Sequence, residues 1–129
     1  MKIDRMIFCL NNNPTYVDFW NVYAPVIKNY FNLTPTLMFV GTPKEVSNLN
    51  ISKSYGDIIY LEEVPEAFVE GSWKQWYITW AIYYGATLFP DDVCISSGID
   101  QLLLTKSLFK KIEDVDNDNF VVSFSDAYM

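Results

Sequence analysis

The stretch RMIFCLNNNPTYVDFW, residues 5–20, decides the fold that we expect for this chain. Its first part, residues 5–10, is a short apolar run without a polar face, as is typical of a parallel strand that is covered on both sides. Residues 11–15 are turn-forming residues, and Thr15 is a possible N-cap. From Tyr16 onward, apolar side chains recur every three or four positions, which indicates one face of a helix. The stretch therefore predicts a buried strand that leads through a polar turn into a helix.

The same alternation of strand and helix continues through the rest of the chain. Further strands are predicted at residues 34–41, 56–64, 92–96 and 120–127, and helices at residues 16–31, 70–90 and 104–112. Residues 42–54 are interpreted as a loop or a short irregular helix, and Pro25 should kink the first helix or mark its weakest point. This order favours an α/β fold in one domain, residues 1–129, with an open, mainly parallel, Rossmann-like sheet and helices on both faces.

The charged residues argue against several classes of function. The chain has 16 acidic and 9 basic residues, a net charge of −7 and no histidine. Scattered bases on so acidic a surface argue against binding to nucleic acid or anionic lipid. Without histidine, this chain cannot supply a Ser-His-Asp triad, a Cys-His pair or a His-ligated zinc site. No apolar run is long enough to span a membrane, and the N-terminus is interpreted as a strand and not a signal peptide, so we expect a cytoplasmic protein.

Two sets of apolar side chains are expected to belong to the core. Cys9 and Cys94 each lie inside an apolar run, which predicts two buried, reduced thiols. The helix predicted at residues 70–90 carries a mainly aromatic stripe, which we interpret as core in preference to a ligand platform. The stripe consists of Trp73, Trp76, Tyr77, Trp80, Ala81 and Tyr84.

Polar residues follow the ends of three predicted strands, at Asn11–Asn13, Ser96–Asp100 and Ser125–Asp126. In open α/β sheets, ligands bind beyond the carboxyl ends of the strands. We therefore expect the first and fourth strands to be neighbours, with Asn11 and Asp100 at the same edge. The three asparagines either read a nucleobase or ribose, or form an Asx-type turn. Asp100 is likewise either a ligand or a turn former, and we favour the ligand.

The sequence lacks the glycine-rich motifs that bind phosphate. No G-x-G-x-x-G follows the first strand and no G-K-[ST] occurs, which argues against a nicotinamide dehydrogenase and a P-loop kinase. An acidic protein that binds a phosphate needs a local positive charge, and a divalent metal held by a carboxylate commonly provides it. Asp100 is placed to be that carboxylate.

Four stretches together carry a resemblance to a known family. Residues 5–40 contain a strand, an asparagine-bearing loop, a helix with Tyr and Trp, and a second strand, and GDIIYLEEV matches the third strand. In KQWYITWAIYYGATLFPDDVCISSGIDQLLL, residues 74–104, a Gln-bearing helix leads through FPDD to a strand and a D-x-D-like motif. FVVSFSDAYM is similar to the strand that follows. In this order and spacing the chain resembles the GT-A type glycosyltransferases, the nucleotide-diphospho-sugar transferases.

The resemblance implies roles for several positions. Asn11, Asn12 and Asn13 would lie near the nucleoside of a nucleotide-diphosphate sugar, and Gln75 would lie near the donor sugar or the base. The family's D-x-D carboxylates hold Mn²⁺ or Mg²⁺ against the diphosphate.

The D-x-D-like motif of this chain keeps only one of the two acids. The family's S-D-x-D motif corresponds to Ser97, Gly98, Ile99 and Asp100, so Gly98 replaces the first acid. We expect Ser97, Gly98 and Asp100 to contact the donor, with Asp100 as the metal ligand. The ion should bind weakly in the absence of nucleotide, and the Gly98 N–H could approach a phosphate closely.

Three functions are compatible with these features. In the first, the chain is the N-terminal donor-binding half of a glycosyltransferase whose acceptor, a sugar, lipid or protein, is unknown. In the second, it is a non-catalytic nucleotide-sugar-binding remnant. In the third, it is a structural or interaction domain. The first is favoured, as a fragment of a longer enzyme, because the chain ends soon after the predicted fifth strand. The family places acceptor-binding and catalytic elements beyond that point, so no catalytic base is named.

Overall fold

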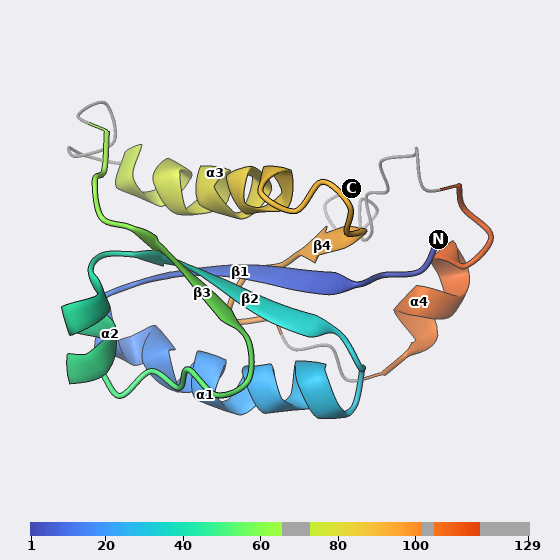
Figure 1. Cartoon of the computed structure of the whole chain (residues 1–129), viewed down its shortest axis with the longest axis horizontal. Coiled ribbons are helices and arrows are strands. Elements are labelled where there is room, and N and C mark those ends of the chain that lie inside the picture. Colours follow the sequence, from blue (N-terminus) through green and yellow to red (C-terminus); the bar gives the residue numbers. More distant parts are fainter. Residues whose placement is uncertain (66–72, 102–104, 117–129) are drawn as a thin grey trace, which may run out of the picture.

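The computed structural model describes residues 1–65, 73–101 and 105–116, and within them the chain forms an all-parallel sheet of order β3-β2-β1-β4 (Figure 1). The strands are β1 (Arg5–Asn11), β2 (Thr34–Val40), β3 (Asp57–Leu61) and β4 (Cys94–Ser96). The helices are α1 (Pro14–Asn29), α2 (Pro43–Asn48), α3 (Trp73–Thr87) and α4 (Ser107–Ile112). The expected α/β fold with a parallel sheet is confirmed, and so is the pairing of β1 with β4. The strand predicted at residues 120–127 lies outside the described residues.

The sheet is covered on both faces, by α1 on one side and α3 on the other (Figure 1). Residues of β1 alternate between the two faces, as expected for a strand. Phe8 and Leu10 belong to the larger buried cluster on the α1 side, whereas Ile7 and Cys9 join the smaller cluster that includes Ala81 of α3. All four β1 side chains are almost fully buried, which explains the apolar run without a polar face.

The sequence of residues 42–54 suggested a loop or a short irregular helix. The structure instead has a regular helix, α2, at the start of this segment. Thr42 and Glu45 form a reciprocal capping box: the Glu45 N–H donates to Thr42 Oγ1 at 3.3 Å, and the Thr42 N–H donates to Glu45 Oε2 at 2.8 Å. The T-P-K-E sequence carries this signature together with proline at the first helical position. The signal for the helix was therefore present in residues 42–45.

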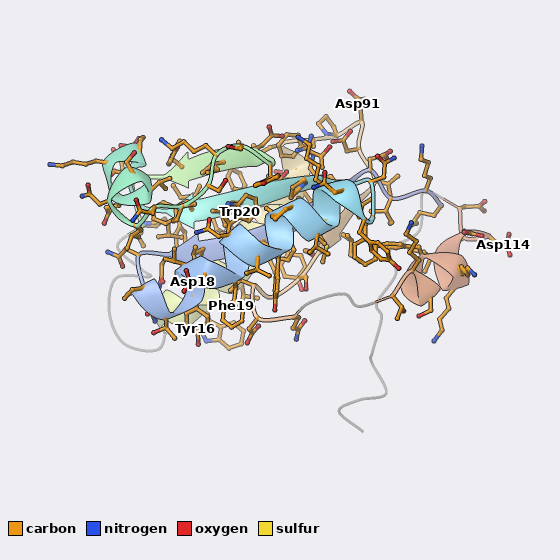
Figure 2. All side chains as sticks on the ribbon, turned by 90° about the horizontal axis from the view of Figure 1, so that it is seen from below. Tyr16, Asp18, Phe19, Trp20, Asp91 and Asp114 are labelled. Carbon is orange, nitrogen blue, oxygen red and sulfur yellow. The ribbon has the colours of Figure 1, made fainter. Side chains whose placement is uncertain are left out.

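Helix α1 runs without interruption from Pro14 to Asn29, past Pro25. Its buried face supports the sheet: Trp20 is fully buried, lies edge-on to Phe8, and donates its indole N–H to the Ser52 carbonyl at 2.8 Å. Figure 2, seen from the α1 side, labels Trp20 on the helix, which lies in front of the sheet. Tertiary packing therefore holds the helix across the position where its proline cannot donate a hydrogen bond.

The prediction that the aromatic stripe of α3 is core is only partly confirmed. Tyr77 and Ala81 are buried against the sheet, but Trp76 is 60% exposed, and Trp80 and Tyr84 are also exposed. The Trp73 side chain lies outside the described residues. The helix is aromatic on more faces than the sheet can cover, because α3 is the outermost layer on its side of the sheet among residues 1–65, 73–101 and 105–116 (Figure 1).

The two cysteines are unpaired, as predicted, but only one is fully buried. Cys9 is buried, and desolvation raises the pKa of its thiol to about 12. Cys94 is half-buried, which corrects the expectation of two fully buried thiols. The reason is that β4 is short and lies at the edge of the described sheet, so its side chains are less completely covered.

A charged cluster at the amino edge of the sheet was not predicted. Arg5 Nη1 donates to Asp57 Oδ2 and to Thr36 Oγ1, each at 2.6 Å, and Arg5 Nε donates to Asp92 Oδ2 at 2.6 Å. The guanidinium also lies 3.6 Å from the centroid of the Phe89 ring. The chain's one arginine therefore links β1 to β2, to β3 and to the residues that lead into β4.

Candidate functional site

The candidate site lies where the strand order of the sheet reverses. From β1 the chain moves outward through β2 to β3, and it then returns to place β4 on the other side of β1. Such a reversal leaves a crevice beyond the carboxyl ends of the two strands that flank it, and open α/β sheets bind their ligands there. Asn11–Asn13 follow β1 and Ser97–Asp100 follow β4, so each predicted cluster comes after one of the two strands that flank the reversal, although β4 ends opposite Ile7, four residues before Asn11.

Beyond β4, the chain leaves the sheet through a tight turn. Ser96 pairs with Ile7 in the middle of β1, and the Ser97 N–H still donates to the Ile7 carbonyl at 3.1 Å. The Gln101 N–H then donates to the Gly98 carbonyl at 3.1 Å, which closes a turn over Gly98–Gln101. Ile99 is buried in the same cluster as Phe8, and it thereby anchors the turn against the core.

Asp100 occupies this turn with its side chain exposed. Its carboxylate has no hydrogen-bonded or ionic partner within the part of the chain that the structure describes. A Cβ added at Gly98 would lie 2.9 Å from Asp100 Oδ1, so the carboxylate lies over the glycine. Asp100 is therefore a turn residue by position, and its carboxylate remains accessible to a ligand.

The asparagine loop after β1 is ordered by its own side chains. Asn11 Oδ1 accepts from the Asn13 N–H at 3.0 Å, and Asn13 Oδ1 caps α1 by accepting from the Thr15 N–H at 3.1 Å. Asn12 instead donates from Nδ2 to Glu45 Oε1 at 3.1 Å. The Asx-type turn is thus present, and the N-cap of α1 is Asn13 and not Thr15.

Glu45 also lies at this edge, although it was not singled out from the sequence. It joins the start of α2 to the asparagine loop. The hydrogen bond from the Thr42 N–H, followed by that from the Asn12 amide, lowers the pKa of the Glu45 carboxyl group. Glu45 is therefore ionised at neutral pH, and it fixes the orientation of the Asn12 amide.

Helix α1 also presents side chains at the carboxyl edge. Figure 2 shows Tyr16 and Asp18 at the end of α1 that follows β1, far from Asp91 and Asp114. Tyr16 is exposed and packs against the Phe19 ring, with 6.0 Å between centroids. An exposed aromatic ring beside a polar loop is a surface on which a planar base can stack.

Gln75 lies in the first turn of α3, and its side chain is outside the described residues. Because α3 runs from the carboxyl end of β3 towards the amino end of β4, its first turn lies at the same edge as the asparagine loop (Figure 1). The fold therefore brings the backbone of Gln75 to the predicted edge. Ser125 and Asp126 lie outside the described residues.

A metal ion at this edge would rely on few protein ligands. Among residues 1–65, 73–101 and 105–116, no group of three or more Cys, Asp or Glu side chains is arranged to hold an ion. The exposed, unpartnered carboxylate of Asp100 fits an ion that takes its other ligands from water and from nucleotide phosphates. These residues are compatible with a weak site that depends on nucleotide.

Comparisons with known proteins do not place the chain in a family: no family model, no curated protein and no solved structure matches it. Within the part of the chain that the structure describes, none of the helices has both the length and the apolar character needed to cross a membrane.

Proposed function

We propose that this chain binds a nucleoside diphosphate sugar at the carboxyl edge between β1 and β4, as the donor-binding part of a GT-A-like glycosyltransferase. The observation that carries the proposal is the position of the two predicted clusters, Asn11–Asn13 and Ser97–Asp100, on the two sides of the sheet's switch point. The resemblance of residues 5–40 and 74–104 to nucleotide-diphospho-sugar transferases supports the same assignment.

The asparagine amides offer a defined set of hydrogen-bonding groups to a base. Asn11 and Asn13 use their side-chain oxygens within the loop and retain NH₂ donors, whereas Asn12 uses its NH₂ group and retains an oxygen acceptor. Because each NH₂ group carries two N–H donors and each amide oxygen has two lone pairs, the loop keeps both donors and acceptors. These groups can meet the two carbonyls and the N–H of a uracil edge, and uridine diphosphate is the nucleotide that we propose, with Tyr16 positioned to stack on the base.

Asp100 would hold the divalent ion, Mn²⁺ or Mg²⁺, that neutralises the diphosphate. When bound, the ion supplies positive charge to the diphosphate leaving group. The Asp100 carboxylate orients it, and the Gly98 backbone leaves space beside that carboxylate because no Cβ is present. The N-terminus of α1 also faces this edge, and its partial positive charge favours phosphate.

The direct test is calorimetric titration of the chain with uridine and guanosine diphosphates, in Mn²⁺ and in EDTA. We expect uridine diphosphate to bind in Mn²⁺ and to bind much more weakly in EDTA. Absence of binding under both conditions would leave the structural or interaction domain as the function. Hydrolysis of a uridine diphosphate sugar, measured in parallel, separates an enzyme from a non-catalytic binding protein.

Restoring the missing acid should strengthen metal-dependent binding. The Gly98 backbone does not adopt the left-handed conformation that Gly41 has at φ 149°, so its backbone permits a side chain. A Cβ there would lie 2.9 Å from Asp100 Oδ1, so the exposed Asp100 carboxylate must rotate away to make room. We expect Gly98→Asp to tighten uridine diphosphate binding in Mn²⁺ by roughly 10–150-fold, the equivalent of one charged contact. Gly98→Asn, of the same shape without the charge, is the control. Equal effects of both variants would contradict a metal contact at this position.

A further inference from the structure

Helix α3 presents an exposed aromatic face that the sheet does not cover. Trp76 is 60% exposed and Tyr83 is 53% exposed, and they are joined by three partly exposed neighbours. These neighbours are Trp80, Tyr84 and Leu88. We call these five residues the α3 face. Exposed Trp and Tyr side chains gathered on one helix are typical of protein interfaces and unusual on free surfaces.

The α3 face is also uncharged. Residues 75–90 contain no Asp, Glu, Lys or Arg, although the chain as a whole carries a net charge of −7. Two copies of so acidic a protein repel each other wherever acidic surfaces meet, so they can approach most easily through a neutral face. Charge therefore favours a second copy of this chain as the partner over a basic protein, for which the α3 face offers no complementary acid.

The exposed area of the α3 face matches the smallest specific interfaces. At their observed exposures, the four aromatic side chains and Leu88 offer roughly 450 Å² per chain. A symmetric pair would bury roughly 900–1,000 Å² in total, which lies at the lower end of specific protein interfaces. A two-fold axis across α3 would bring each aromatic side chain against the same face of the other copy.

The ring geometry favours a protein partner over a carbohydrate. Trp80 stacks on Tyr84 with 4.8 Å between centroids and an interplanar angle of 7°, and on Tyr77 at 5.4 Å and 19°. Sugars stack on open ring faces, but the Trp80 ring is stacked against the rings of Tyr77 and Tyr84. Aromatic side chains of another protein can pack edge-to-face against such rings.

We propose that the α3 face is a self-association surface through which two copies of this chain form a symmetric dimer. The proposal does not depend on nucleotide binding. The α3 face points away from the sheet, whereas the proposed nucleotide site lies at the carboxyl edge of the sheet between β1 and β4. The small area predicts a weak dimer, with a dissociation constant on the order of micromolar.

Sedimentation equilibrium of the chain between low micromolar and several hundred micromolar concentrations tests this proposal. We expect the parent to shift from monomer to dimer, and Tyr83→Glu and Trp76→Glu each to weaken dimerisation at least ten-fold. Val22→Glu is the control, because Val22 is 56% exposed on α1, on the opposite face of the sheet, and receives the same added charge. Circular dichroism confirms that each variant is folded.

Three results would overturn the proposal. They are a parent that stays monomeric throughout, a dimer that Val22→Glu weakens as much as Tyr83→Glu does, and a monomeric parent whose tryptophan fluorescence responds to added oligosaccharide. The last result would assign the α3 face to carbohydrate binding.

Discussion

Replacing Trp20 with alanine is expected to lower the free energy of unfolding by about 4 kcal/mol, the largest effect that we predict for one substitution. Trp20 is fully buried between α1 and the sheet, where its ring lies 6.3 Å from that of Phe8 at 75°. Its removal leaves a cavity under the centre of the sheet. It also deprives the Ser52 carbonyl of the indole N–H that binds it at 2.8 Å.

Urea denaturation followed by circular dichroism measures this effect, with Trp76→Ala as the matched control. The chain is kept dilute enough for the proposed dimer to be dissociated, so that loss of association does not contribute. Trp76 is the same residue type on an exposed face, so its replacement should change the free energy of unfolding by less than about 1 kcal/mol. Comparable losses for the two tryptophans would show that the packing of α1 on β1 does not dominate the stability of the fold.

Replacing Arg5 with methionine is expected to cost about 3 kcal/mol. The change removes hydrogen bonds to two carboxylates. It also leaves the fully buried Thr36 hydroxyl without the hydrogen bond that the guanidinium donates to it. The value lies below that of a fully buried ion pair because Asp57 is 51% and Asp92 32% exposed, so water replaces part of the lost interaction. Burial opposes the charge on Arg5, but the hydrogen bonds to the two aspartates outweigh it and raise the pKa of the guanidinium.

The control for this prediction is Lys28→Met, which removes a charge from the exposed side of α1. It should change the free energy of unfolding by about 0.5 kcal/mol or less. Arg5→Lys should recover only part of the loss, since an ammonium group cannot reproduce the fork that binds Thr36, Asp57 and Asp92 together. If Arg5→Met and Lys28→Met have the same effect, the cluster does not hold the strands together.

Local patterns in the sequence were sufficient to predict the sheet. The apolar run of β1, the polar turn after it and the periodicity of α1 depend on residues close in sequence, and the structure confirms them. The Arg5 cluster was not predictable in this way, because its aspartates lie 52 and 87 residues away along the chain. Such contacts follow from the strand order, which the sequence constrains only indirectly.

The α3 helix shows a second limit of pattern reasoning. A helix with aromatic residues on several faces gives no single apolar stripe, so its sequence does not reveal which residues meet the sheet. Tyr77 and Ala81 do so, and Trp76 does not.

At the candidate site, the sequence pointed to the carboxyl edge of the sheet, but it could not decide between turn former and ligand for each polar residue. The asparagines and Asp100 all take part in turns, and the hydrogen bonds of those turns use only some of their polar side-chain atoms.

Titration of Asp100→Ala with uridine diphosphate and Mn²⁺ tests the central claim most directly. The matched control is Asp91→Ala, because Asp91 is also an exposed acid next to β4 but lies at its amino end, away from the site (Figure 2). The account predicts that Asp100→Ala loses metal-dependent binding, by roughly 10-fold or more, while Asp91→Ala binds like the parent and both remain folded. Binding by Asp100→Ala that equals the parent's in Mn²⁺ would show that Asp100 is a turn residue only, and would contradict a metal-assisted nucleotide site at this edge.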